Sequence, residues 1–144
     1  MKRVVLLSIA LVFAFACEKG DDRVTGTKNV QIIISDPTSG PLRVTADPDP
    51  AKIDRGEAVN WQIVYKSGPP LDTVVIDGFQ AASGATDPFG NGSTFTFGYM
   101  GPSSSGPSET SGAPVKGGDF KYNITVTVSG MGTTKFDPRL IVNY

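Results

Sequence analysis

The 144-residue chain contains no histidine and a single cysteine, Cys17. Without histidine, the usual base that activates a serine or cysteine nucleophile is absent. A structural zinc site needs several Cys or His ligands and an internal disulfide needs a second cysteine, so both are excluded. The sequence also lacks a Gly-x-Ser-x-Gly elbow and a phosphate-binding loop. We therefore expect no catalytic residues, no metal ligands and no cofactor.

A strongly basic composition is also absent. Lys and Arg total 13 against 14 Asp and Glu. Lys2 and Arg3 precede the apolar run at the start of the chain. Without this N-terminal segment, eleven basic residues and a formal charge of −3 remain. Phosphate binding needs clustered basic side chains, and those of this chain are spread singly. Nucleic acid is therefore not an expected partner.

The longest apolar run, Val4–Ala16, is too short for a transmembrane helix. Its thirteen residues are apolar at all but one position. As a helix they would span about 20 Å at about 1.5 Å per residue, whereas a bilayer needs roughly 20 residues. Lys2 and Arg3 precede the run, and the small residues Ala14 and Ala16 end it. This order of basic, apolar and small residues is typical of a secretory signal.

Cys17 follows this segment directly, and the arrangement resembles a bacterial lipoprotein signal. The resemblance implies a cleaved signal peptide over residues 1–16, a palmitate-bearing lipid on Cys17, and a flexible tether over residues 17–28. Several acyl chains, at about 0.8 kcal/mol per buried methylene, hold a protein on a bilayer far better than one chain. Glu18 beside the cysteine implies sorting to the outer membrane. An uncleaved anchor and ordinary secretion are the alternatives.

Residues 29–144 show apolar side chains at a period close to two, which predicts β-strands. No stretch has a convincing helical period, and 17 glycines with 11 prolines favour short strands and many turns. We therefore predict an all-β domain, an antiparallel β-sandwich of about seven to nine short strands. The expected strands cover residues 30–34, 42–46, 51–53, 59–65, 74–76, 95–99, 120–128 and 139–143.

Several segments interrupt these strands. Asp47-Pro48-Asp49-Pro50 predicts a corner or a sheet edge, because proline cannot donate to a β-ladder. Asp77-Gly78 predicts a tight turn. Residues 80–92 are rich in turn formers, and a Gly/Ser/Pro-rich insertion at residues 100–118 has almost nothing to bury. The composition of that insertion predicts a flexible excursion from the domain.

Ala51-Lys52-Ile53 followed by Gly56-Glu57-Ala58-Val59-Asn60-Trp61 resembles the early strands of cupredoxins, and Met131 precedes a final apolar strand as in that family. The resemblance implies a β-sandwich. Copper-binding members carry Cys, His and Met ligands in the last loop, whereas here Met131 stands alone, so a blue-copper site is excluded. An immunoglobulin-like domain with Trp61 as its core tryptophan fits the same residues. The two topologies stay open.

The densest acidic cluster consists of Asp47, Asp49, Asp54 and Glu57. Calcium is the sensible candidate for oxygen ligands of this kind. However, the intervening prolines hold the backbone extended, and the glycine and distal glutamate of an EF-hand loop are missing. The competing interpretation is that each aspartate caps its own turn.

Aromatic side chains beyond the needs of the core are candidates for a ligand platform, because exposed aromatic groups favour carbohydrate or protein contact. These candidates are Tyr65, Phe79, Phe89, Tyr99 and Tyr144. The competing interpretation places them at the ends of the sandwich. The expected core aromatics are Trp61, Phe95, Phe97, Phe120 and Tyr122.

Together these patterns predict a non-enzymatic recognition or structural module on the bacterial cell envelope, anchored through its N-terminal lipid. Its expected partner is an envelope protein or a glycan. One alternative is a calcium-dependent or small enzymatic module that uses the acidic loops at 47–57. Another is an accessory subunit of an envelope complex.

Overall fold

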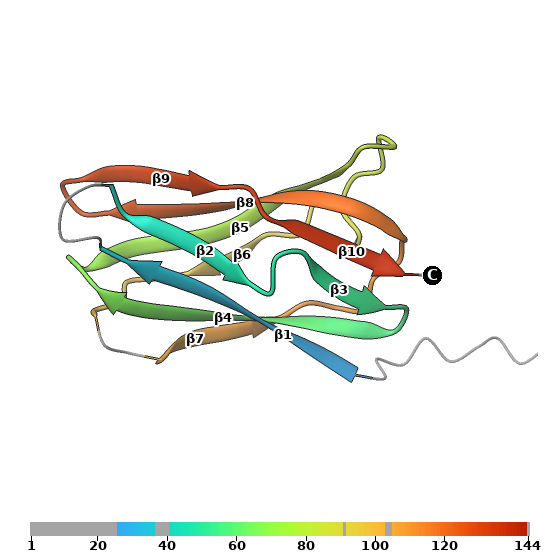
Figure 1. Cartoon of the computed structure of the whole chain (residues 1–144), viewed down its shortest axis with the longest axis horizontal. Coiled ribbons are helices and arrows are strands. Elements are labelled where there is room, and N and C mark those ends of the chain that lie inside the picture. Colours follow the sequence, from blue (N-terminus) through green and yellow to red (C-terminus); the bar gives the residue numbers. More distant parts are fainter. Residues whose placement is uncertain (1–25, 37–40, 91, 103–104, 144) are drawn as a thin grey trace, which may run out of the picture.

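The computed structural model describes residues 26–36, 41–90, 92–102 and 105–143. These residues form an all-β fold of ten strands (Figure 1). The strands are β1 (Gly26–Ser35), β2 (Arg43–Asp47), β3 (Ala51–Asp54), β4 (Glu57–Ser67), β5 (Leu71–Ala81), β6 (Phe95–Phe97), β7 (Ser105–Thr110), β8 (Gly118–Val128), β9 (Gly132–Phe136) and β10 (Arg139–Asn143).

The strands make two sheets, as the sandwich prediction requires. Sheet A has the order β2-β1-β4-β7, and sheet B has the order β3-β10-β8-β5-β6. The remaining strand, β9, pairs with Ile124–Val128 of β8, while β10 pairs with Gly118–Lys121. β5 pairs along one edge of β8. Strands β9 and β10 therefore lie one after the other along the opposite edge of β8. The expected all-β sandwich is confirmed.

The sheets are mixed and not antiparallel throughout, because two strand pairs are parallel. β1 runs parallel to β4 in sheet A, and β10 runs parallel to β3 in sheet B. The cause is the Asp47–Pro50 segment, which leads the chain from β2 at the edge of sheet A to β3 at the edge of sheet B (Figure 1). The chain then returns to sheet A as β4, and it enters from the same end as β1. The predicted corner is confirmed.

The predicted flexible insertion at residues 100–118 is also corrected. Residues 105–110 form β7, which pairs antiparallel with β4 and is an edge strand of sheet A. Beyond its end, the Ser111 N–H donates to the Val59 carbonyl and the Val59 N–H donates to the Ser111 hydroxyl. The strand has no large apolar side chain, so β4 rather than the local sequence determines its conformation.

Two strand boundaries differ from the expected ones. β1 begins at Gly26, so residues 26–28 belong to a sheet and not to the predicted tether. β5 continues through Asp77-Gly78, where a turn was expected, and ends at Ala81. The register with β8 shifts between Asp77 and Gln80, and Gly78 has φ of 65°. The Asp-Gly pair therefore makes a β-bulge, in which glycine supplies the positive φ without a steric cost.

The inward faces of the two sheets form one apolar core. Trp61, Ile63 and Tyr65 alternate along β4 and are almost completely buried, as are their counterparts on β8. The Trp61 ring centroid lies 5.1 Å from that of Tyr122 and 5.9 Å from that of Phe95, both in sheet B. The aromatic residues expected in the core are all buried: Trp61, Phe95, Phe97, Phe120 and Tyr122.

Two buried tyrosines differ in how their hydroxyl groups are satisfied. Tyr65 and Tyr122 are each 1% exposed. The Tyr65 hydroxyl donates to the Pro69 carbonyl, whereas the Tyr122 hydroxyl has no hydrogen-bond partner within the described residues. Burial raises the pKa of both hydroxyls, and the nearby charges of Asp36 and Asp49 raise the pKa of Tyr65 and Tyr122 respectively.

This difference predicts opposite effects of the same substitution. Tyr122→Phe removes an unsatisfied buried group, so we expect the free energy of unfolding to stay unchanged or rise by up to about 1 kcal/mol. Tyr65→Phe removes the hydrogen-bond donor of the Pro69 carbonyl, so it should lower the free energy of unfolding by about 1 kcal/mol. Urea unfolding followed by Trp61 fluorescence measures both. A loss of stability in Tyr122→Phe as large as in Tyr65→Phe would show that the Tyr122 hydroxyl is satisfied in solution.

Gly106 tests whether β7 lies against β4 as described. A Cβ atom at this position would lie 2.9 Å from the Ile63 carbonyl oxygen and 2.8 Å from the Met100 sulfur. Backbone cannot yield as a flexible side chain can, so Gly106→Ala should lower the free energy of unfolding by about 1–3 kcal/mol. Gly112→Ala is the matched control, because a Cβ there meets nothing within 4 Å. Equal stabilities for the two variants would contradict the docked position of β7.

Candidate functional site

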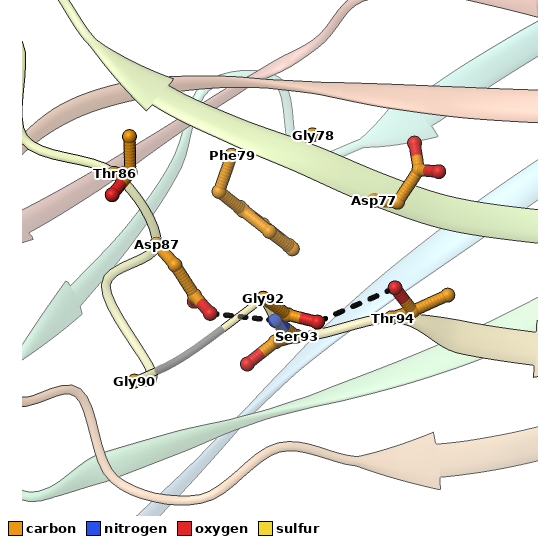
Figure 2. A pocket seen from close by; sticks show the side chains of 9 residues that line it. All are labelled: Asp77, Gly78, Phe79, Thr86, Asp87, Gly90, Gly92, Ser93 and Thr94. Atoms are coloured by element: carbon orange, nitrogen blue, oxygen red, sulfur yellow. Dashed lines mark hydrogen bonds between the residues drawn. The ribbon is translucent and has the colours of Figure 1, made fainter.

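An open pocket of about 460 Å³ lies where β5 ends and the chain crosses to β6. Figure 2 shows its two sides: Asp77, Gly78 and Phe79 come from β5, and the rest from the loop that leads to β6. The loop residues that line the pocket are Thr86, Asp87, Gly90, Gly92, Ser93 and Thr94. None of the lining residues is basic, and most polar groups of the pocket are neutral hydroxyls or backbone groups.

Asp87 organises this loop. Its carboxylate accepts the backbone N–H of Phe89 at 2.9 Å and that of Ser93 at 2.6 Å, one on each oxygen. Its own N–H donates to the Phe79 carbonyl, and its φ of 57° lies in the left-handed region, which aspartate tolerates better than most residues. Asp87 is 5% exposed, so these bonds satisfy a buried charge. The loop is thereby fixed to β5 at one point and closed on itself at another.

The segment after β7 braces the same loop from outside. The Val115 and Lys116 N–H groups both donate to the Pro88 carbonyl, at 2.6 and 3.3 Å. The Lys116 ammonium donates to the Thr86 carbonyl at 3.2 Å. Part of the insertion that was expected to be flexible therefore supports the pocket wall.

On the β5 side, the bulge at Gly78 sets the position of Asp77. The Asn123 amide of β8 donates to one Asp77 oxygen at 3.4 Å, a long hydrogen bond. A Cβ on Gly78 would lie 2.2 Å from the same amide nitrogen, so only glycine lets Asn123 sit beside the bulge. Asp77 is half-buried, and among the residues that the structure describes only the Asn123 amide is a side-chain partner of its carboxylate, which leaves most of that acceptor capacity free there.

An aromatic cluster supports the pocket from below. Phe79 stacks on Tyr122, with ring centroids 5.2 Å apart, and meets Phe89 edge-on at 5.5 Å. Phe89 in turn meets Phe95 edge-on at 6.2 Å. Such pairs contribute about 0.5–1.5 kcal/mol beyond their buried area. The cluster therefore connects the pocket loop to the apolar core.

The predicted aromatic platform does not assemble. Tyr65 and Phe79 are buried and Phe89 is partly buried against the core. Tyr99 is 73% exposed, next to the buried Met100. Tyr144 lies outside the described residues, as does Cys17, so the predicted lipidation site stays a prediction. Met131, the residue that resembled a copper ligand, is 65% exposed beside the turn between β8 and β9.

The acidic residues at 47–57 make separate local contacts. The Asp49 carboxylate accepts the Arg139 N–H at 2.9 Å, and Asp54 accepts the Asn143 amide at 3.0 Å. Glu57 accepts the Asp54 N–H at 2.7 Å across the β3–β4 turn. Within the described ranges, no group of three or more Asp, Glu, His or Cys side chains could hold a metal ion. The carboxylates cap turns and join strand ends, and their geometry gives the calcium hypothesis no support.

One ion pair on the outer face of sheet B shifts a carboxyl pKa. The Arg139 guanidinium donates to both oxygens of Asp119. That hydrogen bonding lowers the pKa of Asp119 and raises the pKa of Arg139. The stabilisation is therefore present above the ordinary aspartate pKa and lost as the pH falls through the lowered value. Because both side chains are about half exposed (49% and 45%), it is small.

The chain matches no protein-family model, and no curated protein is significantly similar to it. In the part of the chain that the structure describes, no helix is long and apolar enough to cross a membrane.

We predict that Asp87 maintains the pocket. Asp87→Ala leaves two backbone N–H groups without their acceptor and places alanine at positive φ. We expect it to lower the free energy of unfolding by about 1–3 kcal/mol and to speed amide exchange at Phe89 and Ser93. Asp87→Asn keeps one acceptor oxygen and tolerates the same φ, so its loss should be smaller. Unchanged exchange at both amides in Asp87→Ala would refute this role.

Proposed function

We propose that this protein is a non-enzymatic recognition module of the bacterial cell envelope, held on the outer membrane by a lipid on Cys17. The observation that carries the recognition role is the pocket beside Asp77 and Asp87. It is a concave site formed by β5 and a loop that the sandwich positions, and binding residues are often carried on such loops. The layout of residues 1–18 supports the anchor.

The chemistry of the pocket favours binding over catalysis. Its lining includes two carboxylates but no histidine, lysine, arginine or cysteine. The Asp87 carboxylate is 5% exposed and each of its oxygens accepts a backbone N–H, so it is poorly placed to reach a ligand proton as a general base would. The hydroxyls of Thr86, Ser93 and Thr94 have no base among the lining residues other than Asp77. The expected partner is an envelope glycan or protein.

The anchor is tested by Cys17→Ser. Since Cys17 precedes β1, the substitution should leave the domain folded but abolish labelling with radioactive palmitate and move the protein out of the membrane fraction. Ser8→Ala, which leaves the thiol in place, is the control and should stay labelled and membrane-bound. Mass spectrometry of the native protein should show a lipidated residue 17 as the N-terminus. An unmodified cysteine with the leader still attached would refute the proposal.

A further inference from the structure

We infer that the pocket between β5 and the loop to β6 binds neutral, hydroxyl-rich ligands, that is, saccharides, and that Asp77 is the carboxylate that accepts their hydroxyl groups. The inference rests on the proposed function, because it names the ligand class of the recognition module.

The pocket lining disfavours anionic ligands and offers a cation few direct contacts. An anion would meet Asp77 and Asp87 with no basic side chain among the lining residues. A cation could contact little of Asp87, which is 5% exposed and whose two oxygens already accept N–H groups at 2.6 and 2.9 Å. The carboxylate that a ligand can reach directly is therefore that of Asp77.

The remaining polar groups suit ligands that both donate and accept hydrogen bonds. Thr86, Ser93 and Thr94 contribute hydroxyls, each with one donor and two lone pairs. Sugar hydroxyls have the same dual character, so they can pair with these groups in either direction. Within the described residues, the Thr94 hydroxyl has only a long 3.5 Å contact with the Gly92 carbonyl, which a ligand can replace at little cost (Figure 2).

Asp77 has the position and the free capacity of a ligand acceptor. It comes from β5, on the side of the pocket opposite Ser93 and Thr94 (Figure 2). Its carboxylate offers about four lone-pair sites, of which the Asn123 amide occupies one. A carboxylate fixed on a strand and supported by a neighbouring side chain loses little freedom when a ligand binds.

The glycines keep the pocket open. Gly90 and Gly92 have φ values of 127° and 69°, and a Cβ on either would meet nothing within 4 Å. Both glycines line the pocket and add no side chain to it. The resulting volume of about 460 Å³ lies within the range of small-ligand sites, roughly 300–1,000 Å³.

The test is a titration of the full ¹⁵N-labelled chain in a zwitterionic, sugar-free detergent with galactose, mannose, maltose and the disaccharide of N-acetylglucosamine. Lysine amide serves as the cationic comparator and inorganic phosphate as the anionic one. We expect at least one saccharide to shift the amide signals of residues 77–79, 86–87, 89–90 and 92–94 selectively. No shift with any saccharide, or shifts with lysine amide alone, would overturn the ligand class.

Asp77→Asn should weaken the saccharide affinity by about tenfold, the loss expected when a charged acceptor becomes neutral. Asp72→Asn is the matched control, since Asp72 is a half-buried aspartate at the other end of β5, and it should bind like the wild type. Thr94→Val, an exposed rim position, should weaken binding several-fold and remains informative if Asp77→Asn is unstable. Wild-type affinity in both pocket variants would refute the site. If Cys17 is lipidated and the titration fails, the ligand class is wrong while the anchored module stands.

Discussion

The contact between Trp61 of β4 and the aromatic rings of sheet B joins the two halves of this molecule. Trp61 lies within 5.1–6.3 Å of the ring centroids of Tyr122, Phe95 and Phe79, and it is fully buried. With no disulfide available, the fold depends on the packing of such apolar faces, because neither sheet can shield its inner face alone. The same cluster continues through Phe79 to Phe89, so the pocket loop is attached to the aromatic part of the core.

The parts of the fold that bury apolar side chains could be predicted from the sequence, because alternation at a period of two is visible in one segment at a time. The long alternations became β4 and β8. The strands that were not predicted are β7 and β9, which hold mainly small and polar residues and are largely exposed. β7 exists because β4 offers it an unpaired edge, and β1 is parallel to β4 because a distant proline-rich corner reorders the chain. The free edge of β4 and the proline-rich corner both lie outside the strands that they determine. Neither β7 nor the direction of β1 could therefore be predicted from the sequence of that strand alone.

For the candidate site, the sequence indicated local turn contacts but not the contacts between residues that are distant along the chain. The turn formers in residues 80–92 indicated turn chemistry, and the hydrogen bond from the Phe89 N–H to the Asp87 carboxylate two residues earlier is of that type. The second bond, to Ser93, and the brace from Val115 and Lys116 join residues that are distant in sequence. Conversely, the acidic residues at 47–57 are close in sequence but make separate contacts with β10 and the β3–β4 turn. The signal that could have indicated the pocket is the run of glycines around residue 90, whose positive φ values depend on the folded loop.

The direction of β1 has a consequence for how the module would sit on its membrane. β1 begins at the end of the sandwich where β5 runs out into the pocket loop (Figure 1). Eight residues lie between Cys17 and Gly26, so nine Cα–Cα steps give a covalent reach of at most about 30 Å at about 3.3 Å per step. With acyl chains on that cysteine, the pocket mouth would be tethered near the headgroup layer and the opposite pole would project outward. Sugars carried by neighbouring molecules of that bilayer would then be met at high local concentration, whereas a ligand from bulk solution would have to enter the narrow gap beneath the domain.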